Sequence, residues 1–324
     1  MGFLKKNRRH AAIATGNFTA MFKDVEIPPL PKAVTRLIQE INNPEPDIDR
    51  LAELISSTAG VAAKVIQTVN SALFSLRMPV TNVKHAVSLL GLQQIRSITL
   101  ACATMDALPK PKSTFFDPEA FWTDSLLQAM LSRSFAKNLF QKQSEDVFTA
   151  SLLTDVAIPV LLCVWSEYYE PVIKEWRQSP RRLSEIEREH FGWDHAQAGA
   201  WISQAWGFPE EMVCYLAAHN LSREKINELE LADTIASAIA VAAISPSVLK
   251  PDPGRCESVF QGATQWLSLS DSIFIDCVIE VKASLTEMME VFGLSDRNAI
   301  DILEKFLMVA DSENHEEEAC KKEN

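Results

Sequence analysis

The stretch FTASLLTDVAIPVLLCVW, residues 148 to 165, decides the fold class. It is almost continuously apolar, and Asp155 is its only charged residue. Because a buried β-strand usually has about 4–8 residues, an apolar run of this length is more typical of a buried helix. Pro159 has no backbone N–H to donate, so we expect the helix to kink or break there. The stretch therefore predicts a central, deeply buried helical segment.

Apolar residues recur every three or four positions through most of the remaining chain, which is the spacing of a helix face. Such stripes occur at Val34, Leu37, Ile38 and Ile41, at Leu51, Leu54 and Ile55, and at Ile273, Cys277, Val281, Leu285, Met288 and Phe292. Strands and helices do not alternate in the pattern. Glycine, with 10 of 324 residues, is scarcer than the usual share of about 7%. We therefore expect an all-α fold rather than a turn-rich β fold.

The composition is that of a globular protein without nucleic-acid or membrane partners. Lys and Arg number 31 against 43 Asp and Glu, so the net charge is −12 and opposes binding to a phosphate backbone. Hydrophobic residues make up 47% of the chain, but we expect no membrane span, because the uncharged run 234–249 is shorter than the ~20 residues required. The six cysteines stand singly, without a Cys-x-x-Cys pair, which favours a reducing, cytoplasmic location.

The apolar pattern also suggests where the domain begins and ends. Residues 1–25 show little periodicity and are predicted to form a flexible tail. Residues 26–310 are expected to form the domain, with one helical lobe at 26–112 and a second at 113–310. The acidic stretch 311–324 has no apolar spacing and is expected to be disordered.

Seven short motifs, in this order and spacing, carry a resemblance to a known family. They are IPPLP at 27–31, VNSALF at 69–74, AVSLLGLQQI at 86–95, FWTDS at 121–125, SLLTDVA at 151–157, FGWDHAQAGAWISQAWGFP at 191–209 and LAD at 231–233. In them the chain resembles the HDOD family, a bacterial signalling domain related to the metal-dependent HD phosphohydrolases. The resemblance extends over about residues 27–310. It implies an HD-domain-like bundle of many helices with an N-terminal helical lobe.

The resemblance also implies a set of candidate metal ligands. HD enzymes hold one or two metal ions with histidines and aspartates on neighbouring helices, and the matching residues are Asp124, Asp155, His195, His219 and Asp233. Asp124 and Thr154 stand where metal-binding relatives carry histidines. Asn220 takes the second place of a His-His pair. The alternative is that each candidate is a buried polar group that hydrogen bonds or helix caps satisfy.

Loss of histidine ligands should weaken metal binding strongly, since even the loss of an outer partner costs about 10- to 100-fold in affinity. We therefore expect a non-catalytic signalling module without a cofactor, which acts through a signalling protein or a small ligand, with a homodimer as one form. One alternative is a metal-dependent phosphohydrolase of phosphoesters or cyclic dinucleotides, with Asp155 bridging Mg²⁺, Mn²⁺, Fe or Zn²⁺. Another is binding of a nucleotide or cyclic dinucleotide without turnover.

Two further residues belong to the VNSALF motif. Asn70 and Ser71 have a functional interpretation, as polar groups of a ligand groove beside the N-terminal lobe. They also have a structural one, as a buried hydrogen-bond clamp at the end of a helix, which is the commoner role of such residues. The structural interpretation is favoured.

Overall fold

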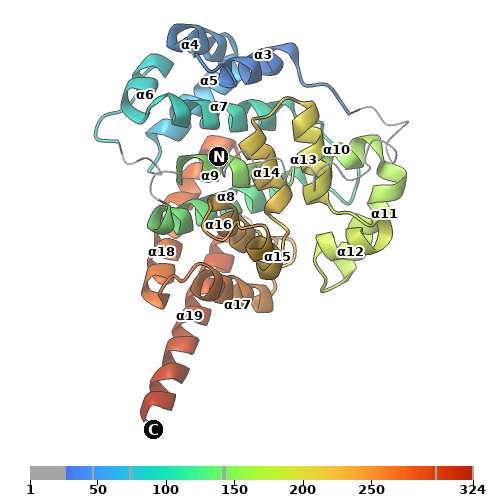
Figure 1. The fold of residues 1–324 in the computed structure, drawn as a ribbon, viewed down its shortest axis with the longest axis vertical. Coiled ribbons are helices and arrows are strands. Elements are labelled where there is room, and N and C mark those ends of the chain that lie inside the picture. The colour runs from blue at the N-terminus through green and yellow to red at the C-terminus, as the bar shows by residue number, and fades with distance from the viewer. Residues whose placement is uncertain are drawn as a thin grey trace. The chain divides into compact units, whose positions relative to one another are not determined.

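The computed structural model describes residues 27–45, 47–72, 74, 76–140, 144–295 and 298–322. Within these residues the regular elements are helices, and there is no β-strand (Figure 1). The all-α fold class is therefore confirmed. The expected tail at residues 1–25 lies outside the described residues.

The chain divides into two compact units. The first consists of Met1–Pro118 with Leu152–Asn220, and the second of Glu119–Ser151 with Leu221–Asn324. Each unit is thus assembled from two separate stretches of the chain, an arrangement that apolar spacing does not reveal. The lobes expected at 26–112 and 113–310 stay predictions.

In the described part of its first stretch, the first unit has five helices that pack against one another. They are α3 (Lys32–Ile41), α4 (Ile48–Ser57), α5 (Ala59–Asn70), α6 (Val83–Leu90) and α7 (Leu92–Ala107). Helix α7 packs against α3, α5 and α6, and α4 packs against α3, α5 and α6. The predicted apolar stripe of α3 is buried, and Leu37 is only 1% exposed. Short helices of this kind gain most of their stability from such packing rather than from helix propensity.

The first unit continues with five helices from the second stretch of chain. They are α10 (Ala157–Val164), α11 (Ser166–Gln178), α12 (Leu183–Phe191), α13 (His195–Ala205) and α14 (Glu210–Ala218). Helix α10 packs against α11 and α13, α12 packs against α11, and α13 packs against α14. These contacts hold together the elements that carry the candidate ligands of this unit.

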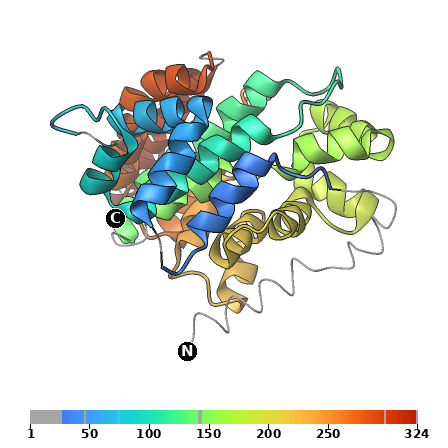
Figure 2. The same ribbon diagram turned by 90° about the horizontal axis from the view of Figure 1, so that it is seen from above.

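The turn between α13 and α14 is attached to the beginning of the same unit. Gly207 adopts a positive φ of 78° there, a conformation that a residue without a Cβ takes at little cost. Its carbonyl oxygen accepts a hydrogen bond from Asn42 Nδ2 at 2.7 Å, and Trp206 Nε1 donates to the Pro28 carbonyl at 3.0 Å. Helix α3 consequently lies beside the α13–α14 pair (Figure 2).

The apolar stretch 148–165 is divided between two helices, α9 (Ser144–Leu152) and α10. Residues 153–156 form the turn between them. The expected break at Pro159 was therefore wrong in position, because the chain turns before the proline. Pro159 lies in the first turn of α10, where a backbone N–H has no partner within the helix and its absence costs little. The earlier break places Asp155 in a turn.

The same stretch is apolar enough to resemble a membrane span. By length and composition alone, Asp146–Val164 could cross a membrane. In the structure, 78% of this stretch is buried inside the protein. Such burial is typical of the core helices of a globular protein.

The second unit is built around Phe274. Its elements are α8 (Pro118–Leu139), α9, α15 (Arg223–Glu228), α16 (Ile235–Ala242), α17 (Pro253–Gln261), the π-helix η1 (Gly262–Trp266), α18 (Asp271–Phe292) and α19 (Ala299–Lys322). The Phe274 ring of α18 lies 5.9 Å from Phe135, 5.2 Å from Phe260 and 6.3 Å from Phe306 between ring centroids. These partners come from α8, α17 and α19, so one aromatic cluster joins four helices.

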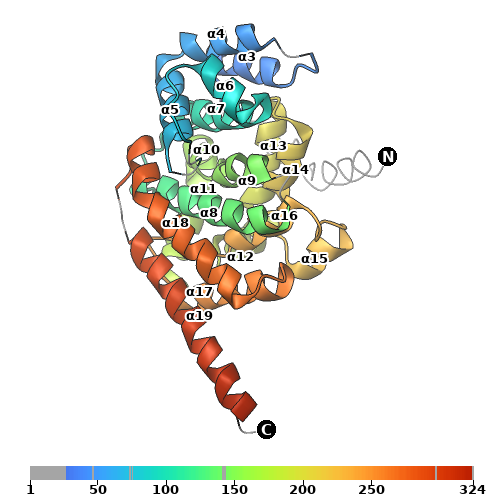
Figure 3. The same ribbon diagram turned by 90° about the vertical axis from the view of Figure 1, so that its left-hand side faces the viewer.

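The last helix of the second unit extends to the C-terminal end of the described residues. Helix α19 packs against α17 and α18 and continues to Lys322, so its last turns extend beyond both (Figure 3). The disorder expected for residues 311–324 stays a prediction. Glu and Lys make up half of residues 311–322, and the high helix propensity of these residues favours continuation of a packed helix.

Candidate metal centre

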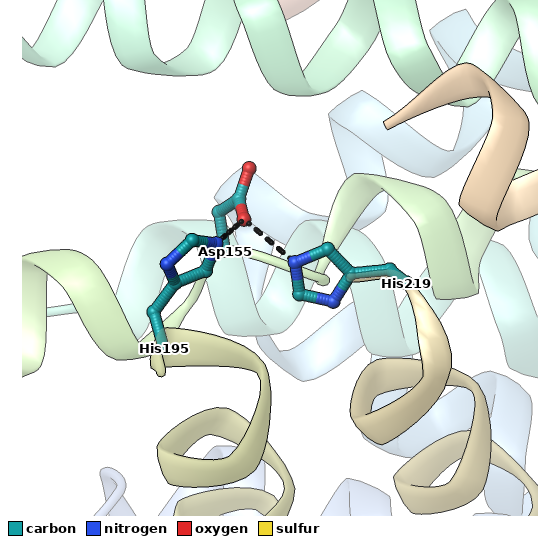
Figure 4. Close-up of side chains that lie close together, drawn as sticks. All are labelled: Asp155, His195 and His219. Atoms are coloured by element: carbon teal, nitrogen blue, oxygen red, sulfur yellow. Dashed lines mark ion pairs between the residues drawn. The ribbon is translucent and has the colours of Figure 1, made fainter. Parts of the chain in front are cut away.

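Asp155 lies in the turn between α9 and α10 and faces two histidines. Its Oδ1 atom is 3.2 Å from Nε2 of His195 and 3.2 Å from Nε2 of His219. Figure 4 shows both imidazole rings directed toward this one carboxylate. One ligand atom from each of the three residues lies within 4.8 Å of the other two. Three residues far apart in the sequence therefore meet at one point of the first unit.

His195 is the first residue of α13, and the residues around that helix start orient its ring. Asp194 caps the helix by accepting hydrogen bonds from the N–H groups of Ala196 and Gln197. Oε2 of Glu187 accepts from the His195 backbone N–H at 2.9 Å and from its Nδ1 at 2.6 Å. A proton on Nδ1 leaves Nε2 as the atom that faces Asp155, which is the usual arrangement of a metal-binding histidine.

Glu187 is completely buried and was not singled out from the sequence. Its other oxygen accepts a hydrogen bond from the hydroxyl of Tyr169, which is itself buried. The sequence of α12 did hold a signal for it. Glu187 lies four positions after Leu183, on the same apolar face of the helix, where an apolar residue is expected. A carboxylate at a core position is rarely found without a partner.

His219 follows the last residue of α14 and is held by the backbone. Its Nδ1 donates to the Leu216 carbonyl at 2.7 Å, and a carbonyl oxygen can only accept. The proton of the neutral ring is therefore on Nδ1, and Nε2 faces Asp155. Only 2% of this side chain is exposed. The two rings lie 5.2 Å apart between centroids.

Asn220 completes the cluster. Its Nδ2 atom lies 2.9 Å from Nε2 of His195 and 3.1 Å from Nε2 of His219. Its Oδ1 atom accepts a hydrogen bond from the guanidinium of Arg182 at 3.0 Å. Neither Arg182 nor this role of Asn220 was expected from the sequence, because a hydrogen bond across 38 residues leaves no local pattern.

The charges of the cluster shift its pKa values. Burial by itself raises the pKa of the Asp155 carboxyl, but the hydrogen bonds and charges of His195 and His219 outweigh it and hold that pKa well below its ordinary value. Burial lowers the pKa of His195, while the negative charge of Glu187 and the hydrogen bond to Asp155 raise it well above 6.5. Asp155 is thus an anion at neutral pH, and a cation that binds His195 has to compete with a proton.

Two other candidate ligands, Asp124 and Asp233, belong to the second unit. Asp124, on α8, accepts a hydrogen bond from the Val248 backbone N–H at 2.7 Å. Asp233 is exposed in the turn that precedes α16. The three-residue group found among the described residues does not include them. Their assignment as ligands stays a prediction.

Asn70 and Ser71 hold the end of α5. Asn70 donates from Nδ2 to the Val80 carbonyl at 2.8 Å and accepts from the Val80 N–H at 2.6 Å. Ser71 is buried, and its hydroxyl donates to the Thr68 carbonyl at 2.7 Å. This is the geometry of a hydrogen-bonded clamp between the helix end and the residue that lies ten positions after Asn70.

The three converging ligands have the chemistry of a divalent-cation site. Two imidazole nitrogens and one carboxylate oxygen form a set that occurs at catalytic zinc centres and at non-haem iron centres. Ligand atoms around a tetrahedral ion with bonds of about 2.1 Å lie about 3.4 Å apart, close to the 3.2 Å between Asp155 and each histidine. The residues fit such an ion, which would activate water and neutralise phosphate charge when bound.

The chain is similar to several bacterial proteins. The family model of the HDOD domain matches residues 27–222. An uncharacterized protein of Treponema pallidum (strain Nichols) is 24% identical over 209 residues, which are 60% of this chain and 38% of the relative. The chain therefore spans well under half the length of that curated relative.

Three solved structures share the fold. An HDOD domain protein of unknown function from Geobacter sulfurreducens has a TM-score of 0.65 and 22% identity, over 91% of this chain and 98% of its own. A "Putative signal transduction protein" from Marinobacter aquaeolei has a TM-score of 0.61 and 21% identity, over 88% of this chain and 65% of its own. A "Putative phosphohydrolase" from Shewanella amazonensis has a TM-score of 0.58 and 20% identity, over 86% of this chain and 94% of its own. These likenesses establish the fold.

The family model covers more than half of the chain and includes Asp155, His195 and His219. The helical fold agrees with that of the solved HDOD domain protein from Geobacter sulfurreducens. On both grounds, the chain belongs to the HDOD domain family.

Proposed function

We propose that the protein is a non-catalytic regulatory module, which works by binding a signalling protein or a small ligand rather than by turning over a substrate. The observation that carries this proposal is the state of the two histidines. Their Nε2 atoms lie against the amide of Asn220, at the position where the resemblance leads us to expect another histidine. The cluster therefore has the geometry of a metal centre, but an amide stands where a further histidine is expected.

The second candidate function is metal-dependent hydrolysis of a phosphoester or a cyclic dinucleotide. The convergence of Asp155, His195 and His219 favours it, as does the name of the structurally similar phosphohydrolase from Shewanella. In this function Asp155, as the expected bridging carboxylate, would hold the ion together with His195 and His219, and the ion would supply a water molecule of lowered pKa. Binding of a nucleotide without turnover is a third function, and a ligand that binds only the folded state raises the melting temperature.

The partner and the location belong to the same proposal. We place the protein in the cytoplasm, because the six cysteines stand singly in the sequence, without a Cys-x-x-Cys pair. The partner is a signalling protein, with self-association to a homodimer as a further form. Nucleic acid is disfavoured by the net charge of −12.

The test combines a metal analysis with an activity assay. Protein purified without a metal-affinity tag is analysed for Mn, Fe and Zn by mass spectrometry, and then assayed with Mn²⁺ against bis(p-nitrophenyl) phosphate and cyclic dinucleotides. We expect less than stoichiometric metal and no turnover. Metal-dependent turnover that Asp155→Ala abolishes, and that the exposed control Asp276→Ala leaves unchanged, would replace the proposal with the hydrolase.

A further inference from the structure

The amide of Asn220 has a defined orientation because its two ends face different kinds of group. The Arg182 guanidinium, 3.0 Å from Oδ1, has donors and no acceptors. The oxygen of the amide therefore faces Arg182, and the NH₂ group faces the histidines. Asn220 is 9% exposed, so water has little access to its amide.

The histidines present the complementary groups. Nδ1 of His219 donates to the Leu216 carbonyl, and Nδ1 of His195 is bonded to Glu187. A metal ion binds an imidazole only through a lone pair, and in the neutral form of each ring this lone pair is on Nε2, because Nδ1 carries the single N–H. The amide of Asn220 carries two N–H protons, at 2.9 and 3.1 Å from these two lone pairs. In the neutral form of the rings, one amide proton is therefore available for the lone pair of each ring.

We propose that Asn220, held by Arg182, takes the place of a divalent cation: its NH₂ group occupies the lone pairs with which both histidines would bind the ion. This inference deepens the proposed function and rests on it. The cation concerned is of the borderline class that imidazole and carboxylate ligands bind together, such as Mn²⁺ or Zn²⁺. To bind, it has to break both amide hydrogen bonds and lie beside the positive end of the amide dipole.

The proposal assigns separate roles to the two side chains. Asn220 blocks the ion directly, whereas Arg182 is a positioning residue that prevents the amide from turning its oxygen toward the histidines. An amide oxygen in that place would be a ligand for the ion rather than a competitor. Removal of Arg182 should therefore favour metal binding only while Asn220 is present.

The experiment measures the affinity of the full chain for Zn²⁺ and Mn²⁺ at one fixed pH, by equilibrium dialysis and elemental analysis. Asn220→Ala frees both lone pairs and should bind about 10- to 100-fold more tightly than wild type, as the loss of two competing hydrogen bonds implies. Asn220→Asp adds a carboxylate and should bind more tightly still. The exposed Asn227 supplies the matched controls Asn227→Ala and Asn227→Asp, which should leave the affinity unchanged.

A double-mutant cycle tests the role of Arg182. Arg182→Met should raise the affinity in the wild-type background and have no effect in the Asn220→Ala background. An equal gain in both backgrounds would mean that Arg182 acts by its charge alone, and would overturn its positioning role. The Nε2 ¹⁵N shifts of His195 and His219 give a second measurement, because both should move in Asn220→Ala as the rings lose a donor. Unchanged shifts would contradict the contact.

Two results would overturn the central claim. If Asn220→Ala binds the ions more weakly than wild type, Asn220 is a ligand and not a substitute for the ion. If wild type already binds them as tightly as Asn220→Asp, the site is open. These two results differ from the result that would refute the proposed function. That result is metal-dependent turnover by the wild-type protein. Circular dichroism checks that each variant is folded, and the nearly isosteric Asn220→Asp keeps the test valid if Asn220→Ala does not fold.

Discussion

Glu187 is the buried anion that supports the cluster, and its replacement should be among the most destabilising in the first unit. Its carboxylate accepts three hydrogen bonds, from the Tyr169 hydroxyl and from the backbone N–H and Nδ1 of His195. Its side chain is 0% exposed. Water therefore cannot replace these bonds when the carboxylate is removed.

The magnitude follows from these contacts. Removal of one partner from a buried charged pair typically costs about 3–5 kcal/mol. We expect Glu187→Ala to lower the free energy of unfolding by about 4 kcal/mol, a large part of the roughly 5–15 kcal/mol of an ordinary domain. Glu187→Gln keeps an oxygen that can accept the two hydrogen bonds from His195, but this oxygen carries no full charge. The substitution should therefore lower the free energy of unfolding by about 1–2 kcal/mol.

The pH dependence follows from the pKa of His195, which is raised in the folded protein. A raised pKa means that the folded state favours the protonated ring, so this stability is fully present below the unfolded pKa of about 6.5 and is lost as the pH rises through the folded pKa. Glu187→Gln loses much of this contribution. The difference in stability between wild type and Glu187→Gln should therefore be largest near about pH 6 and shrink as the pH rises.

The assay is urea unfolding followed by tryptophan fluorescence at several pH values. The control is Glu189→Gln on the same helix, whose carboxylate pairs with Arg181 and is 65% exposed. A surface change of this kind should stay within about 0.5 kcal/mol of wild type. The reasoning is refuted if Glu187→Gln is as stable as that control, or if its deficit grows as the pH rises.

Three further predictions concern other residues. Asn70→Ala removes two hydrogen bonds to the Val80 backbone and should lower the free energy of unfolding by about 2 kcal/mol in urea titrations; a loss below about 0.5 kcal/mol would contradict the clamp. Burial is the largest cause that raises the pKa of Cys102, to about 12. Ellman's reagent should therefore label the exposed Cys163 well before Cys102 in the folded protein, and equal labelling rates would count against this packing. Asp155 has a lowered pKa, so its stabilising effect is present above the unfolded pKa of about 3.9 and lost as the pH falls; the deficit of Asp155→Asn should shrink between about pH 7 and pH 3, and a constant deficit would contradict that shift.

Part of the candidate site was predictable because its residues lie in sequential motifs. Asp155, His195 and His219 each stand in or near a short stretch that the family resemblance covers, and the structure brings these three together. Glu187 and Arg182 were missed because their roles depend on contacts across 8 and 38 residues. Such contacts leave only an indirect trace in the sequence, such as a charged residue on an apolar face of α12.

The sequence by itself determined the helical class, because the spacing of apolar side chains directly reflects the period of a helix that buries one face. It also indicated the family, and it supplied five candidate ligands, three of which the structure brings together. Only the tertiary structure decided the place of the break before α10, the interleaved units and the direction in which the Asn220 amide points. These features depend on which polar groups meet in the folded chain, where a buried donor without an acceptor is costly. The orientation of one amide against Arg182 and two histidines is therefore a property of the fold and not of any segment.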